Sequence, residues 1–157
     1  MPKLTHMDEE GNARMVDVGG KAVTRREALA EGWISLSQDA YDAVLEGQIS
    51  KGDVLTIAQV AGIQAAKKTS DWVPLCHPLA LTGIRLILKP VDGQRIRAEA
   101  RVRCEGKTGV EMEALCAVSG ALLCIYDMLK AIDKAMVIGP IQLCNKSGGA
   151  SGDWSRD

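Results

Sequence analysis

The chain has no phenylalanine, and only three tryptophans and two tyrosines occur among its 157 residues. Hydrophobic residues nevertheless make up 46% of the sequence. A core without large rings must therefore be filled by Leu, Ile, Val, Ala and Met, which favours helices packed closely on a sheet. We expect a single domain over residues 1–157, because a chain of this length can bury a sizeable core.

The sequence also lacks an excess of either charge. Nineteen Lys and Arg residues balance twenty Asp and Glu residues, which gives a formal net charge of −1. This balance argues against a nucleic-acid-binding module, since such modules depend on a broadly basic surface. The start of the chain has no apolar segment like that of a signal peptide, and no uninterrupted apolar run is long enough to span a membrane. We therefore expect neither nucleic acid nor membrane as a partner, and a cytoplasmic location.

Close cysteine pairs are missing as well. The five cysteines include no C-x-x-C pair of the kind found in zinc sites and redox motifs. Cys116, Cys124 and Cys144 lie in apolar runs, where cysteine behaves as a small buried hydrophobic residue. We expect no metal held by protein ligands, and a reducing compartment.

Hydrophobic periodicity predicts the secondary structure. We expect a strand within residues 21–36, with helix as the alternative, then helices over 37–46 and from 54 to about 68. Residues 81–90 and 95–104 read as a hairpin around a turn at 91–94, and alternation in the second strand predicts one buried and one wet face. A helix from 108 to about 132 and a strand over 136–144 follow. Residues 1–20 read as a weakly ordered arm, and 146–157 as a Gly/Ser-rich C-terminal segment.

Two of these helices carry possible capping boxes. Ser50 to Asp53 precedes the second helix, and Thr108 to Glu111 precedes the long one. The order strand, helices, strand, strand, helix, strand is that of an α+β ferredoxin-like split βαβ sandwich. In such a fold an antiparallel sheet carries helices packed on one face.

The stretch Pro74-Leu75-Cys76-His77-Pro78 holds one of only two histidines in the chain. Flanking prolines stiffen the backbone and aim the imidazole, as a general acid or base, a metal ligand or a substrate-binding donor would require. The alternative is a rigid turn in which His77 has no chemical role.

Charged residues on the predicted long helix are further candidates. Glu111 stands where a capping-box acid would bond back to the helix start, whereas Glu113 has no such structural explanation. Asp127 and Lys130, three apart, either form a surface ion pair or point into a pocket or interface, because their segment is apolar nearly all round. Glu113 and Asp127 are about 21 Å apart along a helix, so one small substrate would need a neighbouring subunit to supply one of them.

Basic residues suggest a site for an anion. Lys51 stands at a predicted helix start, where the helix dipole disfavours a cation, so phosphate binding is one reason for its position. Lys21, Arg26 and Lys146 could join it, and Ser147 to Gly152 could form a backbone nest or a flexible tail. The alternative for each lysine is an ordinary solvated side chain.

Seven segments together resemble the MoaC family. They are 15–18 (MVDV), 51–54 (KGDV), 61–67 (AGIQAAK), 74–78 (PLCHP), 106–115 (GKTGVEMEAL), 126–128 (YDM) and 146–149 (KSGG). The resemblance covers nearly the whole chain in the right order. It implies a lyase of molybdenum cofactor biosynthesis that converts a cyclic dihydroguanosine triphosphate, derived from GTP, to cyclic pyranopterin monophosphate and diphosphate. It also implies a ferredoxin-like fold and a hexamer of three dimers, with active sites at the dimer interfaces.

The resemblance also assigns residues. Asp127 and Lys130 would form the central proton-transfer pair, each tuning the other's pKa in a desolvated site, and Lys51 and His77 would be catalytic too. Leu75, Cys76, His77, Met112, Glu111 and Glu113 would surround the substrate, with Glu113 accepting hydrogens from its guanidine-like edge. Lys51, Lys146, Arg26 and Lys21 would hold the triphosphate. No cofactor is implied firmly, and a divalent cation accompanying the triphosphate is left open.

Two other classes of function stay open on the residues alone. A non-catalytic oligomeric module could bind a nucleotide as a regulator, with Asp127 and Lys130 as an interface ion pair. A metal-dependent phosphohydrolase could use His77 and carboxylates as ligands, although the sequence has only two histidines and no H-x-x-E or D-x-D cluster.

Overall fold

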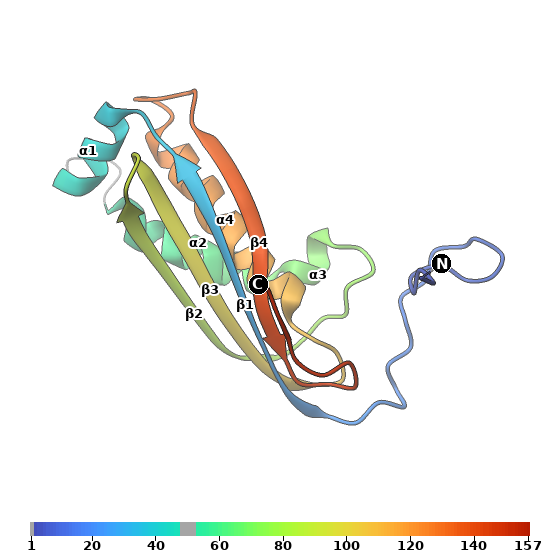
Figure 1. Ribbon diagram of the computed structural model, residues 1–157. Coiled ribbons are helices and arrows are strands. Elements are labelled where there is room, and N and C mark those ends of the chain that lie inside the picture. The colour runs from blue at the N-terminus through green and yellow to red at the C-terminus, as the bar shows by residue number, and fades with distance from the viewer. Residues whose placement is uncertain (1, 48–52) are drawn as a thin grey trace.

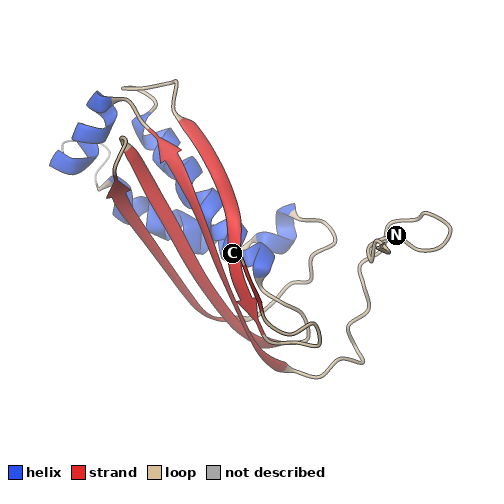
Figure 2. Ribbon diagram, in the orientation of Figure 1, coloured by secondary structure: helices blue, strands red, loops and turns tan. Residues whose placement is uncertain are grey.

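One antiparallel five-stranded sheet carries the helices α2 and α4 side by side on one of its faces (Figures 1 and 2). The computed structural model describes residues 2–47 and 53–157. In chain order the elements are β1 (Thr24–Ser35), α1 (Gln38–Glu46), α2 (Val54–Lys67), α3 (Thr69–Trp72), β2 (Leu81–Val91), β3 (Arg95–Gly106), α4 (Glu111–Leu129), β4 (Val137–Ser147) and β5 (Trp154–Ser155).

The strand order is β2-β3-β1-β4-β5, with every neighbouring pair antiparallel. Strand β3 therefore lies between β1 and β2, which the crossover through α2 connects. This is the split βαβ arrangement, and the predicted ferredoxin-like α+β fold is confirmed. The predicted hairpin is confirmed too, with Gly93 and Gln94 at positive φ in the turn between β2 and β3.

Small and β-branched residues line the helix-facing side of the sheet, as the lack of large rings requires. The alternate residues Ala28, Ala30 and Ile34 of β1 are fully buried. Alternate residues of the neighbouring strand β3 are fully buried as well, so the alternation predicted there is confirmed: Ile96, Ala98, Ala100 and Val102. These short side chains let α4 lie close to the two central strands.

Side-chain caps begin α1 and α2. The Ser37 hydroxyl accepts the backbone N–H of Ala40, as expected for the start of α1, and Gly47 ends this helix at positive φ. The carboxylate of Asp53 caps α2 by accepting the backbone N–H groups of Leu55 and Thr56. The capping box predicted there gave Asp53 the third helical position, whereas the structure makes it the cap itself. Ser50, Lys51 and Gly52 lie outside the described residues.

The capping box predicted at Thr108 is wrong. Helix α4 begins at Glu111 with Val110 in the cap position, and no side chain caps it. Val110 is 1% exposed, so burial of this side chain in the core, rather than a hydroxyl cap, fixes where α4 starts. The helix ends at Leu129, three residues before the predicted end, and the amides of Ile132 and Asp133 close a final turn on the Leu129 carbonyl.

By length and composition α4 is apolar enough to cross a membrane. Ten of its nineteen residues are buried against the sheet and α2, which is how the core helix of a globular domain behaves.

Four structural features were not predicted from the sequence. Helix α3 is a single turn, and β5 pairs only two residues with Asn145 and Lys146. Strand β4 extends to Ser147, so Lys146 and Ser147 belong to the sheet rather than to the C-terminal loop. In the N-terminal arm, Met7 pairs with Ala13 around a turn, and this part of the arm projects away from the body of the protein (Figure 1).

Glycine allows α2 and α4 to approach each other. A Cβ at Gly62 would lie 2.2 Å from Leu86 Cδ2 and 2.7 Å from the backbone oxygen of Ala117. We expect Gly62→Ala to lower the free energy of unfolding by about 2 kcal/mol, because the backbone oxygen of Ala117 can move away only if α4 itself shifts. Helix propensity alone predicts the opposite sign, a gain of about 1 kcal/mol. Urea denaturation decides between them, with Gly83→Ala as a control because nothing lies within 4 Å of its Cβ position.

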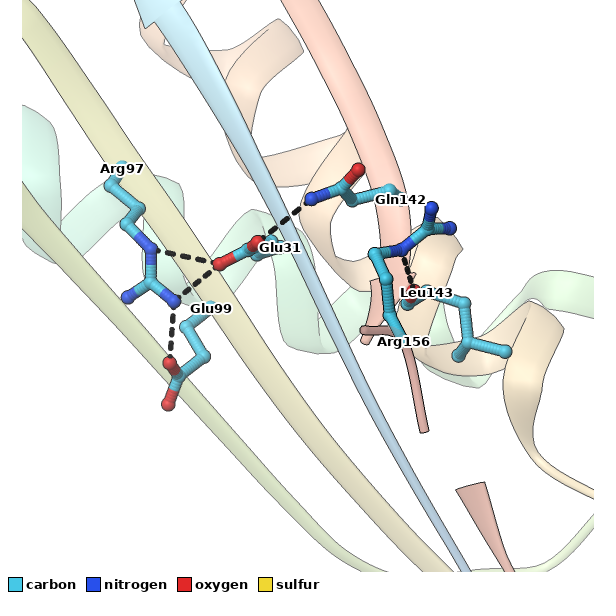
Figure 3. A network of polar contacts seen from close by, with 6 residues as sticks. All are labelled: Glu31, Arg97, Glu99, Gln142, Leu143 and Arg156. Carbon is cyan, nitrogen blue, oxygen red and sulfur yellow. Dashed lines mark hydrogen bonds and ion pairs between the residues drawn. The ribbon is translucent and has the colours of Figure 1, made fainter. Parts of the chain in front are cut away.

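The other face of the sheet carries ion pairs instead of helices. Glu31 of β1 lies between Arg97 of β3 and Gln142 of β4, at 2.5 Å and 2.9 Å, and Arg97 also bonds Glu99 at 2.8 Å (Figure 3). Arg156 donates to the carbonyl of Leu143 at 2.8 Å, which ties the C-terminal segment to β4.

Candidate active site

A buried carboxyl group lies in the first turn of α4. Glu113 is 2% exposed, and the thiol of Cys76 lies 3.9 Å from its Oε1. The other oxygen, Oε2, is buried and has no hydrogen-bond partner among the described residues. An unsatisfied buried oxygen of this kind costs stability, which points to a functional reason for its retention.

Burial sets the protonation of this pair. Burial, aided by the charge of Glu111, raises the pKa of Glu113 to about 7, although hydrogen bonds from its own backbone amide and from the Cys76 thiol oppose the rise. Burial also raises the pKa of Cys76 to about 11, with the charge of Glu113 contributing. Cys76 is therefore a neutral thiol that donates a hydrogen bond, rather than a thiolate nucleophile.

His77 connects this region to the N-terminal arm. Its Nε2 lies 2.6 Å from the carbonyl oxygen of Val16. Because a carbonyl only accepts, Nε2 carries the proton, and Nδ1 is the ring nitrogen left for a ligand. Lys107 donates to the carbonyl of Gly19 at 2.9 Å, a second attachment of the same arm.

A hollow of about 650 Å³ lies beside this turn, between the start of β1, the start of α4 and the loop after β4. We call it the β1–α4 hollow. Its lining includes the predicted site residues Lys21, Arg26, Glu111 and Lys146, together with Gly149 and Ser151. Three cations and one carboxylate thus surround a space large enough for a phosphate chain.

The loop after β4 is shaped around Arg26. The guanidinium is largely buried and donates through Nε to the carbonyl of Gly106 at 3.2 Å. Gly148 and Gly149 both have positive φ, and a Cβ at Gly149 would lie 1.8 Å from Arg26 Nη1. Lys146 donates to the Ser151 hydroxyl at 2.6 Å across the same loop. Only glycine at position 149 lets the loop pass this close to the arginine.

The remaining catalytic candidates lie elsewhere. Asp127 and Lys130 form an ion pair at 2.6 Å at the far end of α4, with side chains 62% and 53% exposed. The carboxylate raises the pKa of Lys130. The desolvation expected for this pair is thus not found in a single chain. Lys51, the other predicted catalytic lysine, lies outside the described residues.

The structure therefore places the predicted residues in two groups. Near the start of α4 lie the hollow, Glu113 with its neighbour Met112, and the turn formed by Leu75, Cys76 and His77. Asp127 is about 21 Å from Glu113 along the helix, at 1.5 Å per residue, and Lys130 follows directly after the last residue of α4. Sequence reasoning did not assign Lys107 or the arm carbonyls of Val16 and Gly19, although Lys107 and Val16 occur in segments that carry the family resemblance.

Among the described residues, no group of three or more His, Cys, Asp or Glu side chains is arranged to hold a metal ion. Oxygen atoms of a bound polyphosphate could still supply most ligands of a magnesium ion, which protein sites often hold through only one or two carboxylates.

Comparison with known proteins gives a consistent result. The sequence model of the MoaC family matches residues 15–149. The chain is 55% identical to a cyclic pyranopterin monophosphate synthase from Pelotomaculum thermopropionicum, over 99% of this chain and 92% of that protein. It is 56% identical to the protein of the same name from Desulfitobacterium hafniense, over 99% of this chain and 95% of that one. A molybdenum cofactor biosynthesis bifunctional protein from Synechococcus elongatus is 58% identical over 90% of this chain, which spans 45% of that protein.

Proposed function

Because this chain belongs to the MoaC family, we propose that it is a cyclic pyranopterin monophosphate synthase of molybdenum cofactor biosynthesis. Its substrate would be a cyclic dihydroguanosine triphosphate, and its products cyclic pyranopterin monophosphate and diphosphate. The observation that carries this proposal is the β1–α4 hollow, in which Lys21, Arg26 and Lys146 surround a space beside the buried carboxyl of Glu113.

The cations suit the phosphate chemistry. A substrate hydroxyl attacks the innermost phosphorus, loses its proton to a base, and expels diphosphate as the bond to the next phosphate breaks. Negative charge grows on the departing group, so fixed cations stabilise the transition state more than the ground state. Arg26 is best placed for this, since its guanidinium is already held by the Gly106 carbonyl and needs little reorganisation.

Glu113 suits the recognition of the base-derived rings. A carboxylate can accept two N–H groups from a guanidine-like edge, and binding such donors favours its ionised form. The unpartnered Oε2 is the oxygen available for this contact. The Cys76 thiol donates to the other carboxylate oxygen of Glu113, Oε1. In this proposal His77 offers Nδ1 to the substrate, and Met112 and Leu75 pack against it.

Asp127 and Lys130 are proposed as the proton-transfer pair of the ring rearrangement, and Lys51 as a further catalytic residue. Their distance from Glu113 supports the further proposal that active sites are shared between subunits. The hexamer of three dimers is proposed from the likeness to the family alone. A cytoplasmic location fits the five cysteines, none of which forms a disulfide.

We expect Asp127→Asn to lower turnover at least about 100-fold, because the amide cannot accept a proton. The test supplies the cyclic triphosphate and follows diphosphate and pterin product together. Asp71→Asn is the matched control: Asp71 forms an exposed i,i+3 pair with Lys68 at 3.8 Å, and its loss should leave turnover unchanged. Full turnover by Asp127→Asn would remove this pair from the mechanism. Tight binding of intact substrate by the wild type, with no product, would favour the regulatory module instead.

A further inference from the structure

A second group of cations lies on the face of the sheet that α2 and α4 leave uncovered. Arg85 of β2 is the partner of Arg101 of β3 in the antiparallel register, and residues paired in this way point to the same face. Arg101 alternates with the buried residues Ala100 and Val102, so both arginines face away from the helices. Arg103 lies two positions further along β3 and faces the same way. Three guanidinium groups therefore gather on this face.

These arginines line a hollow of about 270 Å³, together with Gly83 and Ile84. We call it the arginine hollow. Gly83 is the partner of Arg103, next to a shift in the register of β2 and β3, and nothing lies within 4 Å of its Cβ position. Glycine at this position leaves the space opposite Arg103 open. The arginine hollow shares no lining residue with the β1–α4 hollow.

Positive charge in the arginine hollow exceeds negative charge. Glu27 of β1 accepts hydrogen bonds from both Arg101 and Arg103, so one carboxylate serves two guanidinium groups. The Arg85 guanidinium forms no hydrogen bond or ion pair within residues 2–47 and 53–157. Like charges directly opposite each other in a sheet are destabilising, so the pairing of Arg85 with Arg101 lowers stability.

The neighbouring network on the same face has the opposite balance. Arg97 lies between the carboxylates of Glu31 and Glu99, at 2.5 Å and 2.8 Å (Figure 3). This face of the sheet thus places two acids around one arginine, and a few residues away it places one acid among three arginines. An excess of fixed cations in a hollow attracts and binds an anion.

We propose that the arginine hollow binds a small multivalent oxyanion of the phosphate class, at a site separate from the one proposed for the substrate triphosphate. Guanidinium groups bind phosphate oxygens bidentately. Glu27 already holds Arg101 and Arg103 in place, so these side chains lose little freedom on binding, and Arg85 supplies a third contact. The hollow is smaller than the about 300 Å³ at which pockets for whole small molecules begin, so it suits a phosphate chain rather than an entire nucleotide.

Titration of wild type and Arg85→Gln with diphosphate tests this site by calorimetry. The β1–α4 hollow is intact in both proteins, so a difference between their isotherms reports the arginine hollow. We expect Arg85→Gln to bind diphosphate at this site about 10-fold more weakly, the effect of losing one charged hydrogen bond. Lys89→Gln is the matched control, because Lys89 is an exposed cation on the same face of β2 but outside the hollow. Identical isotherms for wild type and Arg85→Gln would overturn the proposal.

Thermal unfolding distinguishes a binding site from a structural role of Arg85. Without diphosphate, Arg85→Gln should be slightly more stable than wild type, because the substitution removes the repulsion from Arg101. With diphosphate, Tm should rise further in wild type than in the variant, and sodium chloride at equal ionic strength should not reproduce this rise. Equal rises in the two proteins, or a rise that sodium chloride reproduces, would overturn the site.

Two probes identify the source of the phosphate groups. Diphosphate and GTP are titrated separately, and the loss of affinity caused by Arg85→Gln is compared between them. A larger loss for diphosphate assigns the site to a free anion, a larger loss for GTP assigns it to the phosphate chain of a nucleotide, and no loss for either overturns it. Turnover of the cyclic triphosphate should be equal in wild type and Arg85→Gln. Wild type without turnover would overturn the proposed function and leave the diphosphate result standing.

Discussion

Glu113→Gln is expected to stabilise the fold above pH 7 while removing most of the activity. Burial holds the pKa of Glu113 near 7 instead of its ordinary 4.5, so the folded protein keeps a proton that the unfolded chain loses. The stability from this carboxyl is complete below about pH 4.5 and is lost as pH rises to about 7. Glutamine has no proton to lose, so the variant should gain about 3 kcal/mol at pH 8 and only about 1 kcal/mol at pH 5.

The stability measurement is urea denaturation of both proteins at the two pH values. Glu105→Gln provides the control, since Glu105 is an exposed glutamate on β3 and should show no such pH-dependent gain. A stability difference between wild type and Glu113→Gln that is equal at pH 5 and pH 8 would show that the buried carboxyl is not held protonated.

The kinetic measurement separates recognition from folding. We expect kcat/KM to fall about 100-fold in Glu113→Gln, since an amide offers one acceptor where the carboxylate offers two. In the wild type, kcat/KM should rise as pH passes through about 7, because ionised Glu113 binds the donor edge, and the variant should lack this rise. Equal pH profiles for the two proteins would assign the dependence to another group.

Gly149→Ala should weaken phosphate binding far more than it weakens the fold. Its Cβ would overlap Arg26 Nη1, so either the guanidinium or the loop must leave its position in the β1–α4 hollow. We expect KM to rise about 100-fold, the size of effect seen when a charged contact is displaced by about an ångström.

Gly152→Ala isolates the cost of backbone strain in the same loop. Gly152 also has positive φ, at +71° against +86° for Gly149, but nothing lies within 4 Å of its Cβ position. Both variants should lose about 1 kcal/mol of stability, and only Gly149→Ala should change KM. Equal KM values in the two variants would mean that the position of Arg26 does not govern binding.

The fold could be predicted because its signals are local. Alternation in β3, the Ser37 cap and the Gly93 turn each depend on residues close in sequence, and the order of elements then leaves few topologies. The start of α4 was predicted wrongly because a tertiary effect decides it. Val110 is buried by the core, and no pattern within residues 108–111 reports that.

For the site, the sequence could predict which residues take part but not how they are arranged in space. Sequence and resemblance suggested Lys21, Arg26, Glu111 and Lys146, but the hollow that unites them joins segments more than 100 residues apart. The close approach of Gly149 to Arg26 could not be predicted either, because it depends on how two segments far apart in the sequence are placed in the fold. The burial of Glu113 follows from the packing of the turn at Cys76 against α4, which no helical period reveals.

The N-terminal arm contacts His77 and Lys107, although it lies before the first strand of the sheet. The sheet begins at Thr24, and a chain trimmed to that residue would keep every strand and helix described here. It would lose Val16 and Gly19, whose carbonyls fix the imidazole and the Lys107 ammonium. Under the role proposed for His77, activity needs a longer stretch of sequence than stability does, and a domain boundary drawn from compactness alone would remove the residue that orients the imidazole.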